Sequence, residues 1–491
     1  MIIPAEHAAY LGIDLGTSGL KLTVVGSSGT VLAEAEGAYD VHARLPGHAE
    51  TDPQDWADAL HRAVRKLATS RWGDGSTTPT LAAVGVTGQM HGIVLSDSDG
   101  RPVRPALLWP DSRAAEVLPR WRALPSSVRG GLSNPLVAGM AGPLLTWLGD
   151  REPDSLARTA AVASPKDWLR RQLTADDAGE RSDASATLLW DVMADDWSGE
   201  ALTLAGLTRG LLPRIVASDA VVGASRILGE HRGDGTPVPV VAGAADTAAV
   251  LVALEASNAV SSLRDAVVVN AGTGIQIVRA TAAPERRVDP VTHLYADASG
   301  GWYEMLAIQN GGSALTWAQR SLAATWQESV ALARQAAPGS SGALFVPFLT
   351  GERGGVAPPG ASAGWSSLTT STGRAELLRS AFEGYALTVR CGIDLLGAGP
   401  GPVLLSGGGG RDPWLRQLLA DVLGRPVSYV SLRSASAVVP PCSPPAASVS
   451  ACRCPPPSCR SSRPPAPTAG RWSRRTRGGV PPWAARRDVG S

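Results

Sequence analysis

The segment YLGIDLGTSGLKLTVV, residues 10–25, decides the fold of this chain. Two short apolar runs flank the glycine-containing turn at residues 16–19, and this pattern predicts two strands joined by a tight turn rather than a helix. A second turn at residues 27–29 precedes a third apolar run at residues 31–35. Three antiparallel strands at the start of a domain are typical of a ribonuclease-H-like unit and not of a dinucleotide-binding domain.

The same order of features returns near the middle of the chain. An apolar run at residues 266–270 leads into Gly272-Thr273-Gly274, and another apolar run follows at residues 275–278. Two copies of a strand, a Gly-Thr turn and a strand predict a duplicated domain with a cleft between the copies.

Length and composition indicate a soluble globular protein. The 491 residues are enough for two or three domains, and 44% hydrophobic with 18% charged residues is the balance of a folded chain. The formal net charge of +1 gives no general attraction to polyanions, so we expect no nucleic-acid partner. The start of the chain does not read as a signal peptide, and no window offers about twenty uncharged apolar residues. We therefore expect a cytoplasmic protein without a membrane anchor.

The C-terminal residues 438–491 differ from the rest of the chain in composition. They contain nine Arg, one acidic residue, twelve of the 38 Pro and four of the five Cys. Such a segment cannot bury enough apolar surface to offset the entropy of ordering it. We interpret it as the translation of a shifted reading frame in a GC-rich gene. A disordered low-complexity arm and a basic nucleic-acid-binding arm are the alternatives.

Two turns have the chemistry of phosphate sites. Asp14 places a carboxylate at a predicted strand end, and the backbone amides of the following turn, which includes Thr17 and Ser18, can hold phosphate oxygens. The carboxylate can hold Mg²⁺ directly or through water. The turn at residues 272–274 would face the first across the cleft. The alternative for each is an ordinary hairpin turn, because Gly, Thr and Ser are common turn formers.

A glycine run at residues 407–410 follows a predicted strand. Without Cβ atoms, Gly408 and Gly409 let the backbone approach a flat ligand, which favours a nucleotide site over a flexible loop. The run lacks the Lys-Ser/Thr ending of a Walker A motif, so a P-loop enzyme is excluded.

Asp246 lies among small apolar residues from 240 to 249. A carboxylate in such surroundings is costly to bury unless it has partners or a chemical role. A desolvated carboxylate is a stronger base toward a hydroxyl group, and the small neighbours leave room for a substrate. The alternative role is that of an N-cap at the start of an Ala-rich helix, and both roles are compatible.

The segment GQMHG at residues 88–92 follows a predicted buried strand, so Met90 and His91 would face a crevice at the strand end. A lone His is more often structural than functional. Trp109 and Asp111 combine an indole face with a carboxylate, which suits a sugar, although a surface turn is an equal alternative.

Together these motifs resemble the FGGY family of carbohydrate kinases, and within it the xylulokinases, over about residues 10–436. The most specific likeness is the GQMHG segment, which resembles the sugar motif of xylulokinases. The resemblance implies an α/β fold with two ribonuclease-H-like domains around a central cleft, as in the actin and hexokinase superfamily. We expect an N-terminal domain at residues 1–256, an ATP-binding domain at residues 257–437, and the aberrant tail at residues 438–491.

The resemblance also implies phosphoryl transfer from Mg-ATP to D-xylulose, giving D-xylulose 5-phosphate, with Asp246 as the general base. ATP and Mg²⁺ are the expected cofactors, and a homodimer is compatible with the family. The expected site comprises the catalytic residues Asp246 and Asp14, the latter also binding the metal; the substrate-binding residues Met90, His91, Trp109, Asp111 and Thr247; and the ATP-binding residues Thr17, Ser18, Gly272, Thr273, Gly274, Gly408 and Gly409.

The chain departs from the family pattern at several positions. Thr247 stands where many members carry an amide residue, and Ala244 and Ala245 replace glycines. After residue 436 the family continues with a small-residue helix beside the nucleotide site, where this chain has its Pro- and Arg-rich tail. The alternatives to a xylulokinase are a ribulose, gluconate or glycerol kinase of the same family, or a nucleotide-dependent switch that has the phosphate turns but no sugar residues.

Overall fold

A computed structural model describes residues 7–72, 79–227, 235–257, 262–352 and 354–431, together with the backbone of residues 453 and 454. The chain divides into two compact units, Met1–Pro456 and Pro457–Ser491. The second unit lies outside the described residues, as does the predicted tail at 438–491 apart from the two backbone positions just named.

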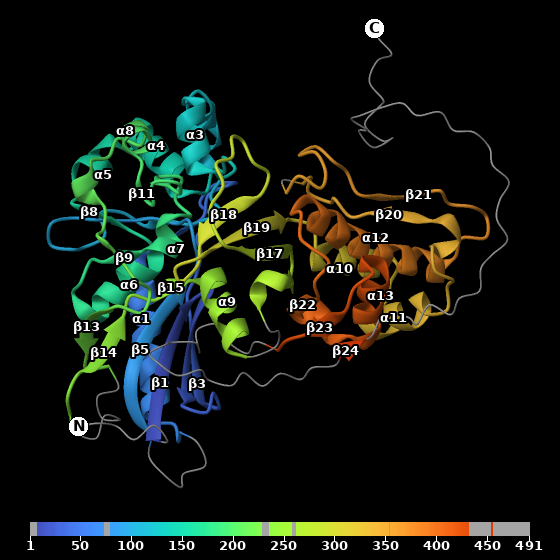
Figure 1. Cartoon of the computed structure of the whole chain (residues 1–491), viewed down its shortest axis with the longest axis horizontal. Coiled ribbons are helices and arrows are strands. Elements are labelled where there is room, and N and C mark those ends of the chain that lie inside the picture. The colour runs from blue at the N-terminus through green and yellow to red at the C-terminus, as the bar shows by residue number, and fades with distance from the viewer. Residues whose placement is uncertain are drawn as a thin grey trace. The chain divides into compact units, whose positions relative to one another are not determined.

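The first domain is built on a mixed sheet with the strand order β13-β14-β5-β1-β2-β3 (Figure 1). Its strands are β1 (Ala8–Leu15), β2 (Gly19–Gly26), β3 (Val31–Ala38), β5 (Thr80–Gly88), β13 (Val221–Ser225) and β14 (Val238–Val241), and the short β15 (Ala244–Ala245) also pairs with β5. The three N-terminal strands are antiparallel, whereas β5 is parallel to β1. Helices α1 (Pro53–Ala68) and α6 (Pro165–Thr174) share a hydrophobic core with this sheet, and α9 (Asp246–Ala256) belongs to a different core.

The second domain repeats this arrangement. Its sheet has the order β18-β19-β17-β16-β22-β23-β24, formed by β16 (Val267–Ala271), β17 (Ile275–Thr281), β18 (His293–Ala296), β19 (Trp302–Ile308), β22 (Val403–Ser406), β23 (Val427–Tyr429) and β24 (Arg453–Cys454). Here β16 and β17 form the hairpin and β22 is parallel to β16, as β5 is to β1. Helices α10 (Gly312–Ser321), α12 (Arg374–Leu395) and α13 (Pro413–Leu423) surround it. The predicted two-domain α/β fold is therefore confirmed.

Shorter elements complete both domains. In the first they are β4 (Glu50–Thr51), β6 (Val94–Ser96), β7 (Ala106–Leu107), α2 (Leu118–Arg122), α3 (Ser126–Leu132), α4 (Ala141–Arg151), α5 (Pro153–Ala157), β8 (Ala161–Ala163), β9 (Gly179–Glu180), α7 (Arg181–Ala184), β10 (Trp190–Asp191), β11 (Asp196–Trp197), α8 (Gly199–Leu204) and β12 (Ile215–Val216). In the second they are α11 (Trp326–Ala333), β20 (Leu344–Val346) and β21 (Gly364–Ser366).

The hairpin of β18 and β19 extends the second sheet to the first domain, where strand β18 contacts α7 (Figure 1). Asn134 holds the hairpin by donating a hydrogen bond to the Leu294 carbonyl at 3.0 Å and accepting one from the Leu294 N–H at 2.9 Å. The Ala296 N–H also donates to Ser185 Oγ at 2.9 Å. Because of these contacts, one hydrophobic core contains residues from both domains.

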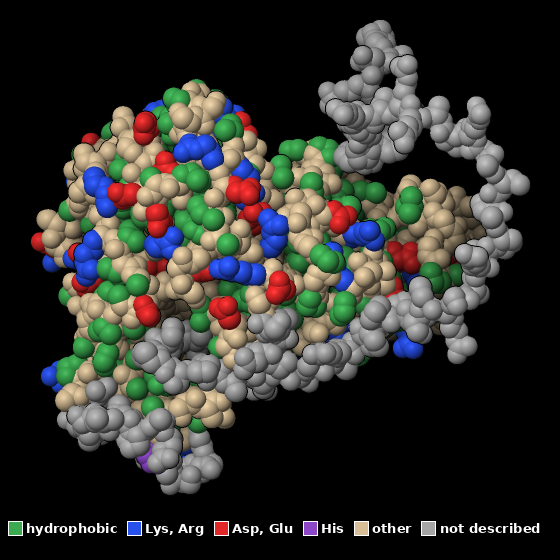
Figure 2. Space-filling model, in the orientation of Figure 1, with side chains coloured by type: hydrophobic (Ala, Val, Ile, Leu, Met, Phe, Trp, Pro, Cys, Tyr) green, Lys and Arg blue, Asp and Glu red, His purple; other side chains and the backbone are tan. Residues whose placement is uncertain are grey.

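The visible face of the molecule carries Lys and Arg side chains interspersed with Asp and Glu side chains over the first domain (Figure 2). Among the described residues, no helix is both long enough and apolar enough to cross a bilayer.

Gly243 lets the chain pass very close to strand β5 between β14 and β15. Its backbone has a φ of +85°, and a Cβ atom there would lie 1.8 Å from the carbonyl oxygen of Val86. No L side chain fits at this distance, so the approach requires glycine. The consequence is that β15 can pair with the end of β5 and place residue 246 directly after it.

We expect the variant Gly243→Ala to lose about 4 kcal/mol or more of unfolding free energy, because the new methyl group overlaps the backbone of β5. Gly424→Ala is the matched control, since Gly424 has a similar φ of +65° but open space around its Cβ position. It should lose only about 1 kcal/mol from backbone strain. Urea denaturation of both variants measures the difference, and equal losses would show that the close approach is not the cause.

Candidate functional site

A cleft with a volume of about 590 Å³ is lined by residues of both domains. It brings together nine of the predicted site residues, which are Thr17, Met90, His91, Trp109, Asp246, Thr247, Gly272, Thr273 and Gly274. The predicted residues Asp14, Ser18, Asp111, Gly408 and Gly409 are not part of its lining.

Asp246 is the first residue of α9 and follows strand β15 directly. Ser182 holds that strand, because its Oγ accepts a hydrogen bond from the Ala245 N–H at 2.9 Å. The Ser182 hydroxyl in turn donates to the carboxylate of Glu180 at 2.8 Å. The side chains of Ser182 and Glu180 are fully buried. They therefore hold the strand before Asp246 through hydrogen bonds that water does not reach.

A buried cluster of charges surrounds Glu180. Lys166 has no exposed surface, and its Nζ lies 2.8 Å from Asp167, 3.1 Å from Asp183 and 3.5 Å from Glu180. Burial alone would lower the pKa of Lys166, but the three carboxylates outweigh it and raise that pKa above its ordinary value. Lys166 therefore stays charged and holds the three acids together. Sequence analysis missed this cluster, because its members lie on three separate elements and charged residues are usually exposed.

Two carboxylates, one in the cleft lining and one beside it, interact through their charges. Burial raises the pKa of Asp246, although the N–H and hydroxyl groups of Thr247 oppose this by donating to Oδ1 at 2.5 and 3.2 Å. Asp14 lies at the end of β1, and burial raises its pKa to about 6, with a further contribution from the negative charge of Asp246 and a smaller opposing one from Lys21. Although Asp14 is not in the cleft lining, it is close enough to Asp246 for their charges to interact.

The first phosphate-type turn is held by three side chains. The Gly16 carbonyl accepts hydrogen bonds from the hydroxyl group of Tyr39 and, at 3.2 Å, from the amide of Gln89. Trp109 donates from Nε1 to Thr17 Oγ1 at 3.1 Å. Trp109 thus lines the cleft as predicted, but its indole N–H is directed to the phosphate-type turn. Ser18 is exposed.

Met90 and His91 lie at the end of β5. Met90 is buried, and the hydroxyl group of Tyr303 on β19 contacts its sulfur at 3.9 Å. His91 has a φ of +73°, which is unusual for a residue with a side chain, and its Nδ1 lies 2.7 Å from the Ala186 carbonyl oxygen.

Two aromatic residues of β18 that sequence analysis did not identify complete this part of the site. The ring of Tyr295 lies 5.7 Å from that of His91, and the ring of His293 lies 6.4 Å from it. The Tyr295 hydroxyl group and His293 Nδ1 are 2.6 Å apart, and His293 lines the cleft. No local pattern reveals them, because they reach the first domain only through the crossing hairpin.

Asp111 has a different environment from the predicted one. It is only 1% exposed, and its carboxylate forms an ion pair with Arg113 at 2.8 Å while accepting a hydrogen bond from the Ala49 N–H at 2.8 Å. The structure therefore places Asp111 inside the protein, where it ties neighbouring loops together.

The second phosphate-type turn packs against the glycine-rich loop. The carbonyl oxygens of Gly272 and Thr273 accept hydrogen bonds from residues at the start of α10 at 3.0 and 3.1 Å. Gly407 has a φ of +87°, and a Cβ atom there would lie 2.6 Å from the Ala271 carbonyl oxygen. Beyond it, Gly408 and Gly409 line a separate recess of about 470 Å³ together with Trp326, Arg411, Asp412 and Pro413.

The charge of Asp246 should have a measurable effect on the pKa of Asp14. Carboxyl-resolved NMR titration should find that Asp14 titrates near pH 6, and that Asp246→Asn lowers its pKa, because a neighbouring negative charge is removed. Asp154→Asn, at an exposed position on α5, serves as the control and should leave that pKa unchanged. An Asp14 pKa that does not respond to Asp246→Asn would contradict the interaction.

Comparison with known proteins shows which family has a similar sequence. Residues 9–253 match the N-terminal domain of the FGGY family of carbohydrate kinases, and residues 267–438 match its C-terminal domain. The chain is 32% identical to a xylulose kinase of Escherichia coli (strain K12) over 428 residues, covering 86% of each chain. It is 31% identical to a xylulose kinase of Streptomyces coelicolor over 448 residues, covering 87% of this chain and 86% of that relative.

A solved structure supports the same assignment. The xylulose kinase from Rhodospirillum rubrum superposes with a TM-score of 0.78 at 26% identity, covering 87% of this chain and 88% of that one. The cleft, its two phosphate-type turns and these likenesses agree, and the chain belongs to the FGGY family of carbohydrate kinases.

Proposed function

We propose that this kinase transfers the γ-phosphoryl group of Mg-ATP to the 5-hydroxyl group of D-xylulose. The observation that carries the proposal is the single cleft in which Asp246 and the Met90-His91 pair face both phosphate-type turns. A sugar hydroxyl next to Asp246 and a triphosphate on the two turns would meet there. The likeness to proteins described as xylulose kinases supports the choice of sugar.

Asp246 is the general base in this proposal. The hydroxyl oxygen of the sugar forms the new bond to phosphorus, the bond from the γ-phosphorus to the bridging oxygen of ADP breaks, and the hydroxyl proton passes to the carboxylate. Thr247 donates to Oδ1, so we assign Oδ2 as the oxygen that accepts the proton. Because burial raises the pKa of Asp246, its carboxylate is a stronger base than one in water.

The residues of the cleft fit a magnesium nucleotide. Among the described residues, no group of three or more His, Cys, Asp or Glu side chains could hold a metal ion by itself. This suits Mg²⁺, which usually keeps several waters and binds through one or two carboxylates and the substrate phosphates. Asp14 would hold it, because burial first and the nearby charge of Asp246 second raise its pKa, and a bound cation would offset both effects. When bound, the metal would neutralise charge on the phosphates.

The remaining nucleotide contacts are assigned to the turns and the glycine loop. Thr17 and the turn from Gly272 to Gly274 would position the phosphates through backbone and hydroxyl groups, and Ser18 would add its hydroxyl at the exposed end. The recess at Gly408 and Gly409 would take the adenine ring, because the absence of Cβ atoms leaves a flat surface there.

Asp246→Asn should reduce kcat about 10³-fold while sugar binding, measured by calorimetry, is retained, because the variant loses proton acceptance and keeps the shape of the side chain. Asp154→Asn, an exposed acid on α5, is the matched control and should keep full activity. Near-normal turnover in Asp246→Asn would exclude the residue as the base. Comparison of D-xylulose with D-ribulose, gluconate and glycerol in the wild-type enzyme tests the assigned sugar.

His91→Asn should raise the KM for D-xylulose about tenfold and change the KM for ATP by less than about twofold. Asparagine tolerates the left-handed backbone at this position, so the change removes the ring without adding strain. His61→Asn, at an exposed position of α1, is the control. Equal increases in both KM values would indicate that His91 has a structural role only.

A further inference from the structure

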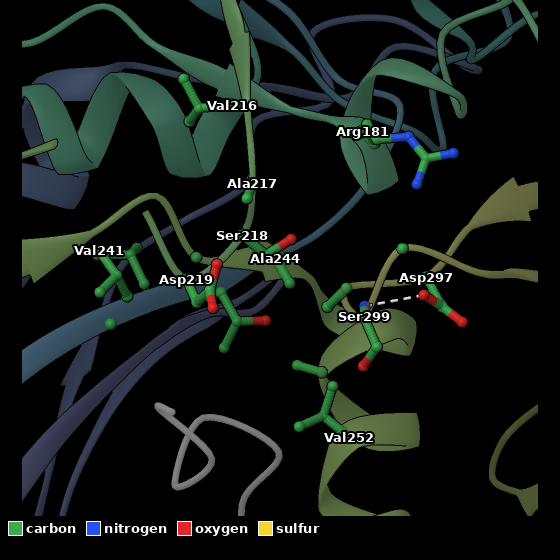
Figure 3. A pocket seen from close by; sticks show the side chains of 17 residues that line it. Arg181, Val216, Ala217, Ser218, Asp219, Val241, Ala244, Val252, Asp297 and Ser299 are labelled. Carbon is green, nitrogen blue, oxygen red and sulfur yellow. Dashed lines mark hydrogen bonds between the residues drawn. The ribbon is translucent and has the colours of Figure 1, made fainter. Parts of the chain in front are cut away.

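A second cavity, of about 440 Å³, is lined in part by Ala244, which Figure 3 labels. Its walls come from β5, the loop after β12, β15, α9 and the turn between β18 and β19. No residue that lines it also lines the catalytic cleft. Its volume lies within the range of small-molecule sites, and residues of both domains contribute to it.

Thr87 supplies an unpaired polar group at this cavity. The residue is only 5% exposed, and its hydroxyl group has no hydrogen-bond partner among the described residues. Thr87 lies on β5 opposite Ala244 of β15, and strand alternation turns it to the face opposite Val86, whose side chain belongs to the core with α1 and α6. A buried hydroxyl group without a partner is destabilising, so a ligand that bonds to it is stabilised in turn.

The charges around the cavity disfavour an anionic ligand. Arg181 is the one cation of its described lining, and its Nε is already paired with Asp195 at 3.0 Å while its guanidinium lies 4.9 Å from the Trp302 ring centre. Two acids, Asp219 and Asp297, also line the cavity. A phosphorylated ligand would therefore meet two acids and only one basic side chain, which is already partly paired.

The same groups disfavour a cationic ligand in the interior. Asp297 uses its Oδ1 to accept hydrogen bonds from the N–H groups of Ser299 and Gly301 at 2.8 and 2.7 Å, as Figure 3 shows for Ser299. Asp219 is exposed at the rim. The interior walls are formed largely by small apolar side chains, where an ammonium group would lose its hydration without a partner.

We propose that this cavity binds a small uncharged polyol of about pentose size, with hydroxyl groups bonded to Thr87 and Asp219 and its C–H face against Val241 and Ala244. A neutral polyol supplies donors for the carboxylate and a partner for the threonine hydroxyl, and it leaves no charge in the apolar part. This site lies outside the catalytic cleft and goes beyond the proposed phosphoryl transfer.

The wall of this cavity is connected to Asp246, the proposed general base. Ala244 lines it and is two residues before Asp246. Ser218, also in the lining, donates to Glu180 at 3.2 Å, and Glu180 holds the serine that bonds the Ala245 N–H. A ligand in this cavity would therefore contact Ala244 and Ser218, which belong to the strand and the hydrogen-bond chain that position Asp246.

Xylitol is the probe, and its binding is measured by saturation-transfer NMR and calorimetry. Because the proposed sugar site in the cleft can also take xylitol, binding is measured with the cleft saturated by D-xylulose. We then expect one further site that Ala217→Trp abolishes, because Ala217 is exposed at the cavity and the indole ring would fill it. Thr87→Val should weaken binding about fivefold through loss of one hydrogen bond. Thr23→Val is the matched control, because Thr23 is a fully buried threonine of the same sheet whose hydroxyl group also has no described partner. It should leave binding unchanged.

His91→Asn separates this cavity from the catalytic cleft, since His91 lines the cleft and does not line this cavity. Xylitol binding that is unchanged by Ala217→Trp and is lost in His91→Asn would place all of the bound polyol in the cleft and overturn the proposal. So would equal effects of Thr87→Val and Thr23→Val, or an absence of xylitol binding in a wild-type protein that is folded. Binding of inorganic phosphate or putrescine in its place, if abolished by Ala217→Trp, would show that the proposed ligand class is wrong.

Discussion

The contact between Gly243 and the Val86 carbonyl oxygen sets the position of Asp246. It brings the chain against the end of β5, where Ala244 and Ala245 pair with Thr87 and Gly88. Because β5 is parallel to β1, its end also lies beside the end of β1, which carries Asp14. Two acids from distant parts of the sequence are thereby placed close enough for the charge of one to raise the pKa of the other. The position of Asp246 beside Asp14 thus depends on the close approach of two backbone segments.

The buried charges below this strand stabilise the arrangement only as a complete set. Lys166, Asp167, Glu180 and Asp183 have lost almost all contact with water, and such burial is unfavourable unless each charge is paired. Removing one partner of a buried pair typically costs about 3–5 kcal/mol, whereas replacing a whole set with apolar groups is often tolerated. These four charged residues together therefore add little to the free energy of unfolding. It restricts where β9 and α7 can lie, and through Ser182 it restricts β15 as well.

Sequence patterns predicted the duplicated fold because each sheet opens with a local feature, an apolar strand that ends in a Gly-Thr turn. The phosphate-type turns were found from this feature, Met90 and His91 from their place after a buried strand, and Asp246 from its small apolar neighbours. Their catalytic and binding roles stay predictions. His293, Tyr295 and Tyr303 could not be found, because they reach the site through a hairpin that crosses between domains. Asp111 has a sequence setting that suits a sugar, yet an adjacent arginine and a backbone amide hold it inside the protein.

The crossing hairpin also connects the two sides of the cleft to which we assign the sugar and the phosphates. Strand β19 contacts Met90 through Tyr303 near one end, and at its other end Ile308 pairs with Ile275, the residue directly after the second phosphate-type turn. A strand rises about 3.3 Å per residue and resists changes in length, because each residue is bonded to its neighbours in the sheet. Any shift of the second phosphate-type turn along the strand direction is therefore transmitted to Met90. In phosphoryl transfer the distance between acceptor and donor controls the rate, and under the proposed roles of Met90 and the second phosphate-type turn one strand of the second domain would set that distance.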